Sequence, residues 1–289
     1  MENENRTDIK FGIVLAGGLS KGAYEIGCLR AIEERFGRDA ISCISASSIG
    51  VPIAYSFAAN KLDEAANLWH RLETESSKRF FATLVRDAEV QKAIRNLPAE
   101  SDEEKMKVFT TLWNFKETKA EYVDMMGHPL ATKRDYMTAS IAIPVFNKGV
   151  QINDKIYFDG AFMDNIPVYP LQREALDFIF CIYFDPQRYT FENEAFDSKI
   201  IHLNDFPVRH RLTENLVFNP KQLEEMMTFG YEYTKKKLRQ IFVSDKPEKI
   251  LAAIAKEKRA HPGKTRTTFD TLLTSCNKIA KKFSKREIL

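Results

Sequence analysis

The chain has 289 residues, of which 44% are hydrophobic and 29% are charged. This balance is ordinary for a soluble globular protein. No segment approaches the roughly 18 uninterrupted apolar residues that cross a bilayer, and the polar N-terminus MENENRTDIK lacks the apolar core of a signal peptide. We therefore expect a cytoplasmic protein without a transmembrane anchor.

The net charge of +3 conceals a basic C-terminal segment. Residues 235–289 hold 16 Lys or Arg against 5 Asp or Glu. The four cysteines lie far apart, without the spacing of a zinc site or a disulfide framework, so we expect buried thiols and neither a metal nor a cofactor.

Two strand-turn-helix units open the chain. Residues 9–16 (IKFGIVLA) predict a buried strand, GGLSKG a turn, and 23–36 a helix that Gly37 ends. Residues 41–47 then predict a second strand, and 51–62 (VPIAYSFAANKL) a second helix. This rhythm is typical of a parallel sheet with helices on its faces.

The rest of the chain gives weaker signals. Residues 63–105 read as helical and charged, either as part of the body or as a lid, and helical patterns return after Asn219. Further strands are expected at 107–113, 119–125, 152–158 and 178–184.

The glycine-rich stretch AGGLSKG, residues 16–22, allows several interpretations. Ala23 and Tyr24 replace the Lys and hydroxyl of a phosphate-binding P-loop, and Leu19 occupies the second glycine position of a dinucleotide fingerprint. An oxyanion hole asks only for main-chain N–H donors near a helix start. A plain tight turn remains an alternative.

The stretch ISCISASSIGVP, residues 41–52, resembles the strand-to-helix elbow that presents a nucleophilic serine. The elbow needs small residues two positions before and after the nucleophile. Centring it on Ser48 places Ala46 and Gly50 there, whereas Ser47 would be flanked by Ser45 and Ile49. Ser48 is therefore the candidate, and Ala46 departs from the usual glycine by one methyl group.

A serine nucleophile needs a base. Asp159 stands at a predicted strand end before Gly160, where open α/β sheets build their sites. Taken alone, an Asp-Gly pair is more often an ordinary turn. None of His70, His128, His202, His210 and His261 has a local catalytic context. His202 and His210 follow late enough for a Ser-Asp-His order and stay open.

These three elements in this order resemble the patatin-like phospholipase family. The matching stretches are Gly17-Gly18-Leu19-Ser20-Lys21-Gly22, Ala46-Ser47-Ser48-Ile49-Gly50 and Asp159-Gly160-Ala161. ASIAIPVF (139–146) and FDGAFMDNIPV (158–168) extend the resemblance to roughly residues 9–171, with a fainter echo at Phe229-Gly230-Tyr231. Leu19 and Ala46 depart from family glycines, and neither removes a reacting atom.

The resemblance implies a serine acyl-ester hydrolase of the phospholipase A or lysophospholipase type. Ser48 would be the nucleophile, Asp159 its base, and Gly17, Gly18, Leu19 and Ile49 the oxyanion hole, with Lys21 in the loop. It also implies an α/β three-layer sandwich, with a mostly parallel central sheet and helices on both faces. We expect this domain over residues 8–244 and a basic helical extension over 245–289.

Residues 269–283 predict an amphipathic helix, because seven apolar or small residues share one side and the lysines point elsewhere. Such a helix lies on an anionic membrane or docks on the body with a solvated basic face. No motif predicts nucleic-acid binding. A carboxylesterase or thioesterase with a Ser-His-Asp triad, and a catalytically silent lipid-binding protein, are the alternative functions.

Overall fold

The computed structural model describes residues 9–74, 88–144, 146–205 and 220–266. Its centre is an eight-stranded sheet with the order β5-β6-β3-β2-β1-β7-β9, in which β4 also pairs with β3. The strands of this sheet are β1 (Phe11–Leu15), β2 (Ile41–Ser47), β3 (Lys107–Asn114), β4 (Lys119–Asp124), β5 (Val150–Ile152), β6 (Lys155–Asp159), β7 (Phe178–Ile182) and β9 (Ile200–Leu203).

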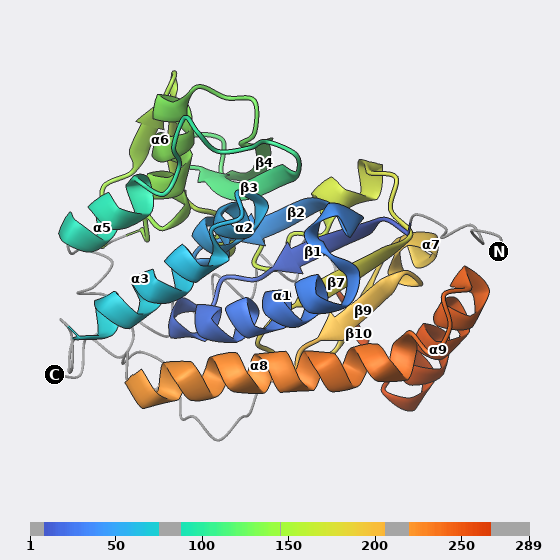
Figure 1. The fold of residues 1–289 in the computed structure, drawn as a ribbon. Coiled ribbons are helices and arrows are strands. Elements are labelled where there is room, and N and C mark those ends of the chain that lie inside the picture. Colours follow the sequence, from blue (N-terminus) through green and yellow to red (C-terminus); the bar gives the residue numbers. More distant parts are fainter. Residues whose placement is uncertain (1–8, 75–87, 145, 206–219, 267–289) are drawn as a thin grey trace, which may run out of the picture.

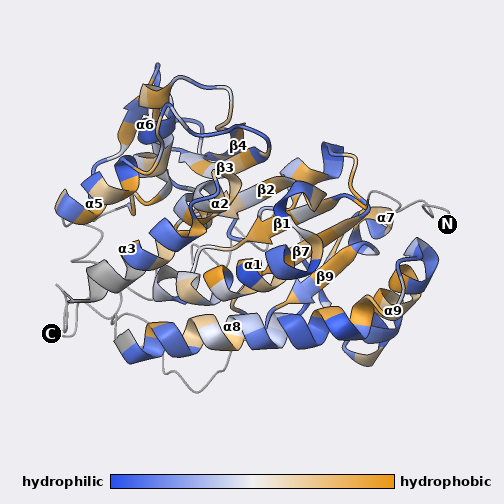
Figure 2. Cartoon of the chain, viewed as in Figure 1, coloured by the Kyte–Doolittle hydropathy of each residue, from blue (hydrophilic) through white to orange (hydrophobic). Residues whose placement is uncertain are grey.

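The sheet is mostly parallel. β3, β2, β1, β7 and β9 run side by side in one direction, and the pairs β3–β4, β3–β6 and β5–β6 are antiparallel. β1 and β7 are buried along their whole length, which explains why their sequences are continuous apolar runs without alternation. Figure 2 shows them as hydrophobic bands in the middle of the molecule.

Long helices cover one face of the sheet, with α8 lying alongside α1 (Figure 1). The helices are α1 (Gly22–Phe36), α2 (Gly50–Ala58), α3 (Leu62–Thr74), α5 (Ala88–Arg95), α6 (Leu130–Ser140), α7 (Glu194–Asp197), α8 (Pro220–Ile241) and α9 (Pro247–Ala260). Short 3-10 helices η1 (Leu19–Lys21), η2 (Arg38–Ala40), η3 (Gly160–Phe162) and η4 (Tyr169–Arg173) occupy the turns.

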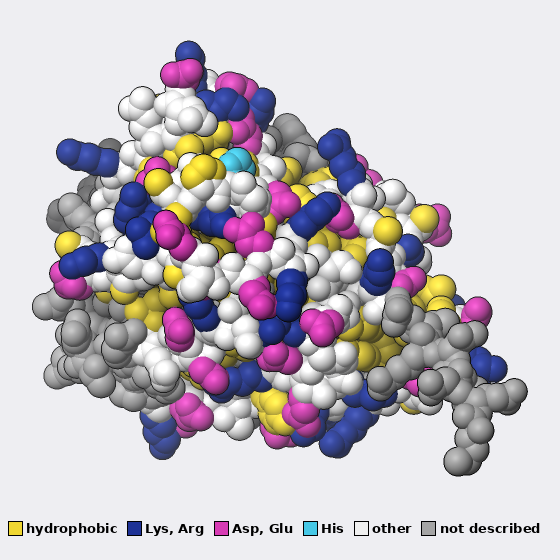
Figure 3. Space-filling model, turned by 45° about the horizontal axis from the view of Figure 1, so that its top comes forward, with side chains coloured by type: hydrophobic (Ala, Val, Ile, Leu, Met, Phe, Trp, Pro, Cys, Tyr) yellow, Lys and Arg dark blue, Asp and Glu magenta, His cyan; other side chains and the backbone are white. Residues whose placement is uncertain are grey.

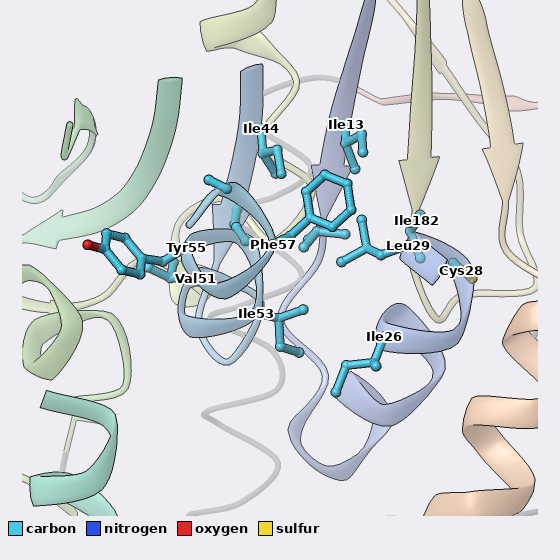
Figure 4. Packing of buried hydrophobic residues seen from close by; sticks show 14 of the residues in the cluster. Ile13, Ile26, Cys28, Leu29, Ile44, Val51, Ile53, Tyr55, Phe57 and Ile182 are labelled. Carbon is cyan, nitrogen blue, oxygen red and sulfur yellow. The ribbon is translucent and has the colours of Figure 1, made fainter. Parts of the chain in front are cut away.

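Two apolar clusters hold these layers together. The larger one joins the sheet to α1 and α2, and Figure 4 shows Leu29 and Phe57 meeting Ile13, Ile44 and Ile182. The smaller cluster lies on the opposite face, because neighbouring strand residues point to opposite sides. It packs Val14, Cys43, Ile179 and Cys181 against residues that include Leu171 of η4 and Phe196 of α7. The predicted α/β class with helices on both faces is confirmed.

The N-terminal expectations hold closely, with one difference. Residues 51–62 were expected to form one helix, but α2 ends at Ala58 and α3 starts at Leu62. Asn60, with a φ of 59°, adopts the left-handed conformation that ends a right-handed helix. Within 63–105, the helices are the rest of α3 and α5, and residues 75–87 lie outside the described part.

The described part of the predicted C-terminal extension contacts the preceding part of the chain. Glu257 of α9 forms an ion pair with Lys237 of α8, and Lys258 bonds Asp197 at 2.6 Å. β10 (Lys264–Arg266) then pairs with β8 (Tyr189–Phe191) in a second, two-stranded sheet. The predicted amphipathic helix and Cys276 lie outside the described residues, and the two-domain division stays a prediction.

Two other features bear on the sequence expectations. Cys28, Cys43 and Cys181 are buried free thiols. A search of the helices in the described ranges finds none with the length and apolar character to cross a membrane.

Candidate active site

Ser48 occupies a sharp turn between a strand and a helix. β2 ends at Ser47, α2 begins at Gly50, and the Val51 N–H donates to the Ser48 carbonyl at 3.0 Å. The φ of Ser48 is 53°, a left-handed conformation that non-glycine residues adopt rarely and that often marks functional sites. This is the backbone shape of a nucleophile elbow.

The elbow accommodates Ala46. Its side chain is fully buried in the larger apolar cluster, and its backbone pairs with Leu15 on one side and Thr110 on the other. Gly50 lies against β1, where a Cβ atom would be 3.1 Å from the Leu15 Cβ. The extra methyl therefore sits within the core, and the turn closes beside it.

Asp159 reaches the elbow because β2 and β6 share one edge of β3. β4 and β6 both pair with residues 112–114, so they must lie on opposite edges of β3. β4 and β2 both pair with residues 109–111, so they too lie on opposite edges. β2 and β6 therefore follow one another along the same edge of β3. Ser47 of β2 pairs with Thr111, and Asp159 of the antiparallel β6 pairs with Leu112. The two strand ends therefore meet at adjacent positions of β3.

Gly160 permits this meeting. A Cβ atom at Gly160 would lie 2.3 Å from the Thr111 carbonyl oxygen, so any other residue would push the chain away from β3. The next N–H, that of Ala161, donates to Asp159 Oδ1 at 2.9 Å. The Asp-Gly-Ala turn thus fixes the carboxylate from its own backbone.

The Ser48 hydroxyl donates to Asp159 Oδ2 at 2.6 Å. Both residues are buried, with 6% and 2% of their surface exposed. Burial raises the pKa of Asp159 to about 7, and the hydrogen bonds from Ser48 and Ala161 oppose that shift. The predicted pair is therefore in direct contact, and the pKa of its carboxyl group lies near neutral pH.

The glycine-rich loop lies against Ser48. A Cβ atom at Gly17 would be 2.5 Å from the Ser48 Cβ, and one at Gly18 would be 2.1 Å from the Phe184 ring. Within the described part of the chain, no hydrogen bond uses the main-chain N–H of Gly18 or Ile49. Unpaired donors beside a serine hydroxyl are what an oxyanion hole requires.

The other loop residues complete its frame. The Lys21 N–H donates to the Gly18 carbonyl at 3.2 Å, and its ammonium group lies 5.5 Å from the centre of the Phe184 ring. Leu19 begins η1 and Gly22 begins α1. The loop thus runs directly into a helix N-terminus, which favours negative charge.

Glu25, in the first turn of α1, is a second fully buried carboxyl group. Burial raises its pKa well above the usual value. Burial therefore favours the uncharged form of Glu25 beside the loop.

Sequence reasoning assigned no role to Asp164 and Asn165. The Asn165 Nδ2 donates to the Gly17 carbonyl at 2.9 Å, and the Asp164 carbonyl accepts from the Ser47 hydroxyl at 3.1 Å. One turn thereby holds the glycine loop and the elbow together. Its only sequence signal was its position in FDGAFMDNIPV, which carried the family resemblance.

Among the described contacts, no histidine side chain hydrogen-bonds Ser48 or Asp159. His202 lies on β9, three strands from β2, which at about 4.8 Å per strand is roughly 14 Å. It is buried against Tyr183, with 3.2 Å between Nδ1 and the hydroxyl. His128 stacks edge-on against Tyr136, while His210 lies outside the described residues. No three His, Cys, Asp or Glu side chains gather as metal ligands anywhere in the described ranges.

Solved structures with a similar fold share little sequence. VipD from Legionella pneumophila has 13% identity and a TM-score of 0.48, covering 93% of this chain and 74% of that chain. The type III effector ExoU has 14% identity and a TM-score of 0.44, covering 81% and 53%. Its complex with SpcU from the type III secretion system of Pseudomonas aeruginosa has 14% identity and a TM-score of 0.38, covering 96% and 61%.

The chain thus spans little more than half the length of the ExoU chains. No curated protein matches it in sequence. The family model for patatin-like phospholipases matches residues 13–171, which is more than half of the chain. This matched segment contains the glycine loop, the elbow and the Asp-Gly-Ala turn, in that order. The chain therefore belongs to the patatin-like phospholipase family.

Proposed function

We propose that this protein hydrolyses the acyl esters of lipids through an acyl-enzyme on Ser48, with Asp159 as the general base. The observation that carries the proposal is the 2.6 Å hydrogen bond from the Ser48 hydroxyl to a carboxyl group whose pKa burial raises to about 7. A base works best when its pKa lies near the working pH.

In the first half-reaction, Ser48 Oγ attacks the acyl carbonyl carbon and its proton moves to Asp159 Oδ2. The tetrahedral oxyanion accepts hydrogen bonds from the main-chain N–H groups of Ile49 and the Gly17–Leu19 loop. When the intermediate collapses, the ester bond breaks and Asp159 returns the proton to the departing alcohol oxygen. The acyl group stays on Ser48.

In the second half-reaction, a water molecule takes the place of the alcohol. Asp159 accepts its proton while its oxygen attacks the acyl-serine carbonyl, and the proton then returns to Ser48 Oγ as the carboxylic acid leaves. Asp159 holds the proton only between steps, so a pKa near neutrality suits both the base and the acid roles.

Aromatic side chains beside Asp159 support an acyl-lipid substrate. Phe158 pairs across the sheet with Trp113, their rings are 5.9 Å apart, and Phe115 and Phe162 extend the cluster. Phe115 and Ile156 are 53% and 45% exposed. Figure 3 shows hydrophobic side chains at the surface of one face of the molecule, between charged ones. Ile156 lies roughly 10 Å from Asp159 along β6, on the strand face opposite to the carboxylate, so an acyl chain would reach this surface only by passing over the edge of the sheet.

Ser48→Ala and Asp159→Asn are each expected to lower kcat by a factor of about 1000 or more, because the nucleophile or its base is lost. Hydrolysis of a p-nitrophenyl ester and labelling of Ser48 by a fluorophosphonate measure this. His202→Ala is the matched control and keeps activity. An active Asp159→Asn variant with an inactive His202→Ala variant would instead favour the triad, whereas vesicle binding without any hydrolysis would favour the silent lipid-binding protein.

The pH profile tests the base. Because only the carboxylate form of Asp159 accepts the Ser48 proton, kcat/KM is expected to rise with pH and to level off above its pKa of about 7. A rate series on an uncharged monomeric ester between acid and mildly alkaline pH measures the inflection. An inflection at the ordinary aspartate value, near ~4, would contradict the proposed environment.

Asp159 is also expected to destabilise the fold as the pH rises. Its native pKa of about 7 exceeds the unfolded value, so the native state retains a proton that the unfolded chain has lost. Stability therefore falls between about pH 4 and pH 7, by roughly 4 kcal/mol in total. Asp159→Asn lacks this loss, so its free energy of unfolding in urea, compared with that of the wild type, increases across this pH range. Asp63→Asn, at a side chain 87% exposed, is the control; a pH-independent advantage would refute the explanation.

The aromatic cluster yields a prediction about chain length. Phe115→Ser is expected to lower kcat/KM for a palmitoyl ester about 5-fold, through the loss of roughly 1 kcal/mol of apolar contact, and to leave a butyryl ester unaffected. Val243→Ser changes a more exposed apolar residue, 72% exposed, beyond the end of α8 and serves as the control. Equal losses with both esters would show that Phe115 does not contact the acyl chain.

A further inference from the structure

We infer that Arg266 is a positioning residue for the elbow and the glycine loop, although it lies almost a hundred residues beyond the matched family segment. It ends β10, the last described strand, which follows α9 and pairs with β8. The kinetic part of this inference rests on the proposed function, and the structural part does not.

Arg266 holds the 164–166 turn at two points. Its Nη2 donates to Asp164 Oδ1 at 3.1 Å, and its Nη1 donates to the Ile166 carbonyl at 3.3 Å. The guanidinium also lies 5.6 Å from the centre of the Tyr189 ring on β8. A planar group with several fixed donors can make these contacts at once, whereas an ammonium group cannot.

Arg266 supplies the positive charge that pairs with the Asp164 carboxylate. The side chains of Asp164 and Arg266 are 8% and 11% exposed, so the pair lies largely out of water. Among the described residues, the other partners of the carboxylate are the Tyr122 hydroxyl at 2.8 Å and the Ile166 N–H at 3.2 Å, both neutral. Loss of Arg266 would leave a buried carboxylate without a positive partner, a strongly unfavourable state.

The same turn holds both catalytic segments. The Asp164 carbonyl accepts from the hydroxyl of Ser47, the residue before Ser48, and Asn165 donates to the Gly17 carbonyl of the glycine loop. The Asp164 N–H donates to the Gly160 carbonyl at 2.9 Å, which ties the turn to the Asp159 segment. Movement of the 164–166 turn therefore displaces the nucleophile relative to its oxyanion donors.

Arg266→Ala is expected to lower kcat about 10- to 100-fold and to leave KM within about 3-fold, because misplacement of reacting groups affects the chemical step more than substrate binding. Arg266→Lys keeps the charge but reaches only one of the two acceptors, so its kcat should lie between those of Arg266→Ala and the wild type. Both are measured on the full chain with a monomeric ester.

Amide hydrogen exchange provides a readout that needs no activity. In Arg266→Ala, peptides covering residues 16–18 and 46–50 should exchange faster than in the wild type, whether or not any ester is cleaved. Arg188→Ala is the matched control, since Arg188 is also largely buried and pairs with Glu257, and within the described ranges its side chain makes no hydrogen bond to the 164–166 turn. It should leave kcat and the exchange of both peptides unchanged.

Unchanged exchange and a kcat within twofold of wild type in Arg266→Ala would overturn the inference, as would equal effects of Arg188→Ala. If Arg266→Ala does not fold, Arg266→Lys decides in the same way, and wild-type kcat and exchange in that variant would overturn it. If the wild-type protein cleaves no ester and these peptides still exchange faster in Arg266→Ala than in the wild type, the proposed function is refuted and the positioning role stands.

Discussion

The candidate site depends on one constraint of the sheet, which is that β2 and β6 end against each other on the same edge of β3. β2 stops at Ser47 and β6 stops at Asp159, opposite the neighbouring residues Thr111 and Leu112. Backbone pairing of β2 and β6 with β3 thus brings Ser48 and Asp159, which are 111 positions apart in the sequence, close enough for a side-chain hydrogen bond. Gly160 is needed at that junction because the chain there lies against the Thr111 carbonyl.

Burial of the junction then determines its electrostatics. The sheet and the helices above it remove water from Asp159, and desolvation disfavours its charged form. The Ser48 hydroxyl and the Ala161 N–H partly offset this cost, and the resulting pKa suits proton exchange with a hydroxyl near neutral pH. The same desolvation makes the native fold less stable at high pH, so the property useful for the proposed reaction acts against stability.

Segments late in the chain complete the frame around this junction. The 164–166 turn bonds the elbow through Ser47 and the glycine loop through Gly17, and Arg266 of β10 bonds the turn. β10 is in place because α9 packs on α8 and because β8 offers a free edge. The matched family segment therefore contains the proposed nucleophile and base, while residues far beyond it bond the turn that holds them.

Local sequence determined much of this protein. Apolar runs predicted β1, β2 and β7, small residues around Ser48 predicted the elbow, and the Asp-Gly-Ala order predicted the turn that carries Asp159, because each depends on residues only a few positions apart. The antiparallel return of β6 onto β3, the bonds of Asn165 and Arg266, and the burial that shifts the pKa of Asp159 were decided only by the tertiary structure. Each joins residues far apart in the chain, and no local pattern of polarity or spacing encodes such a contact.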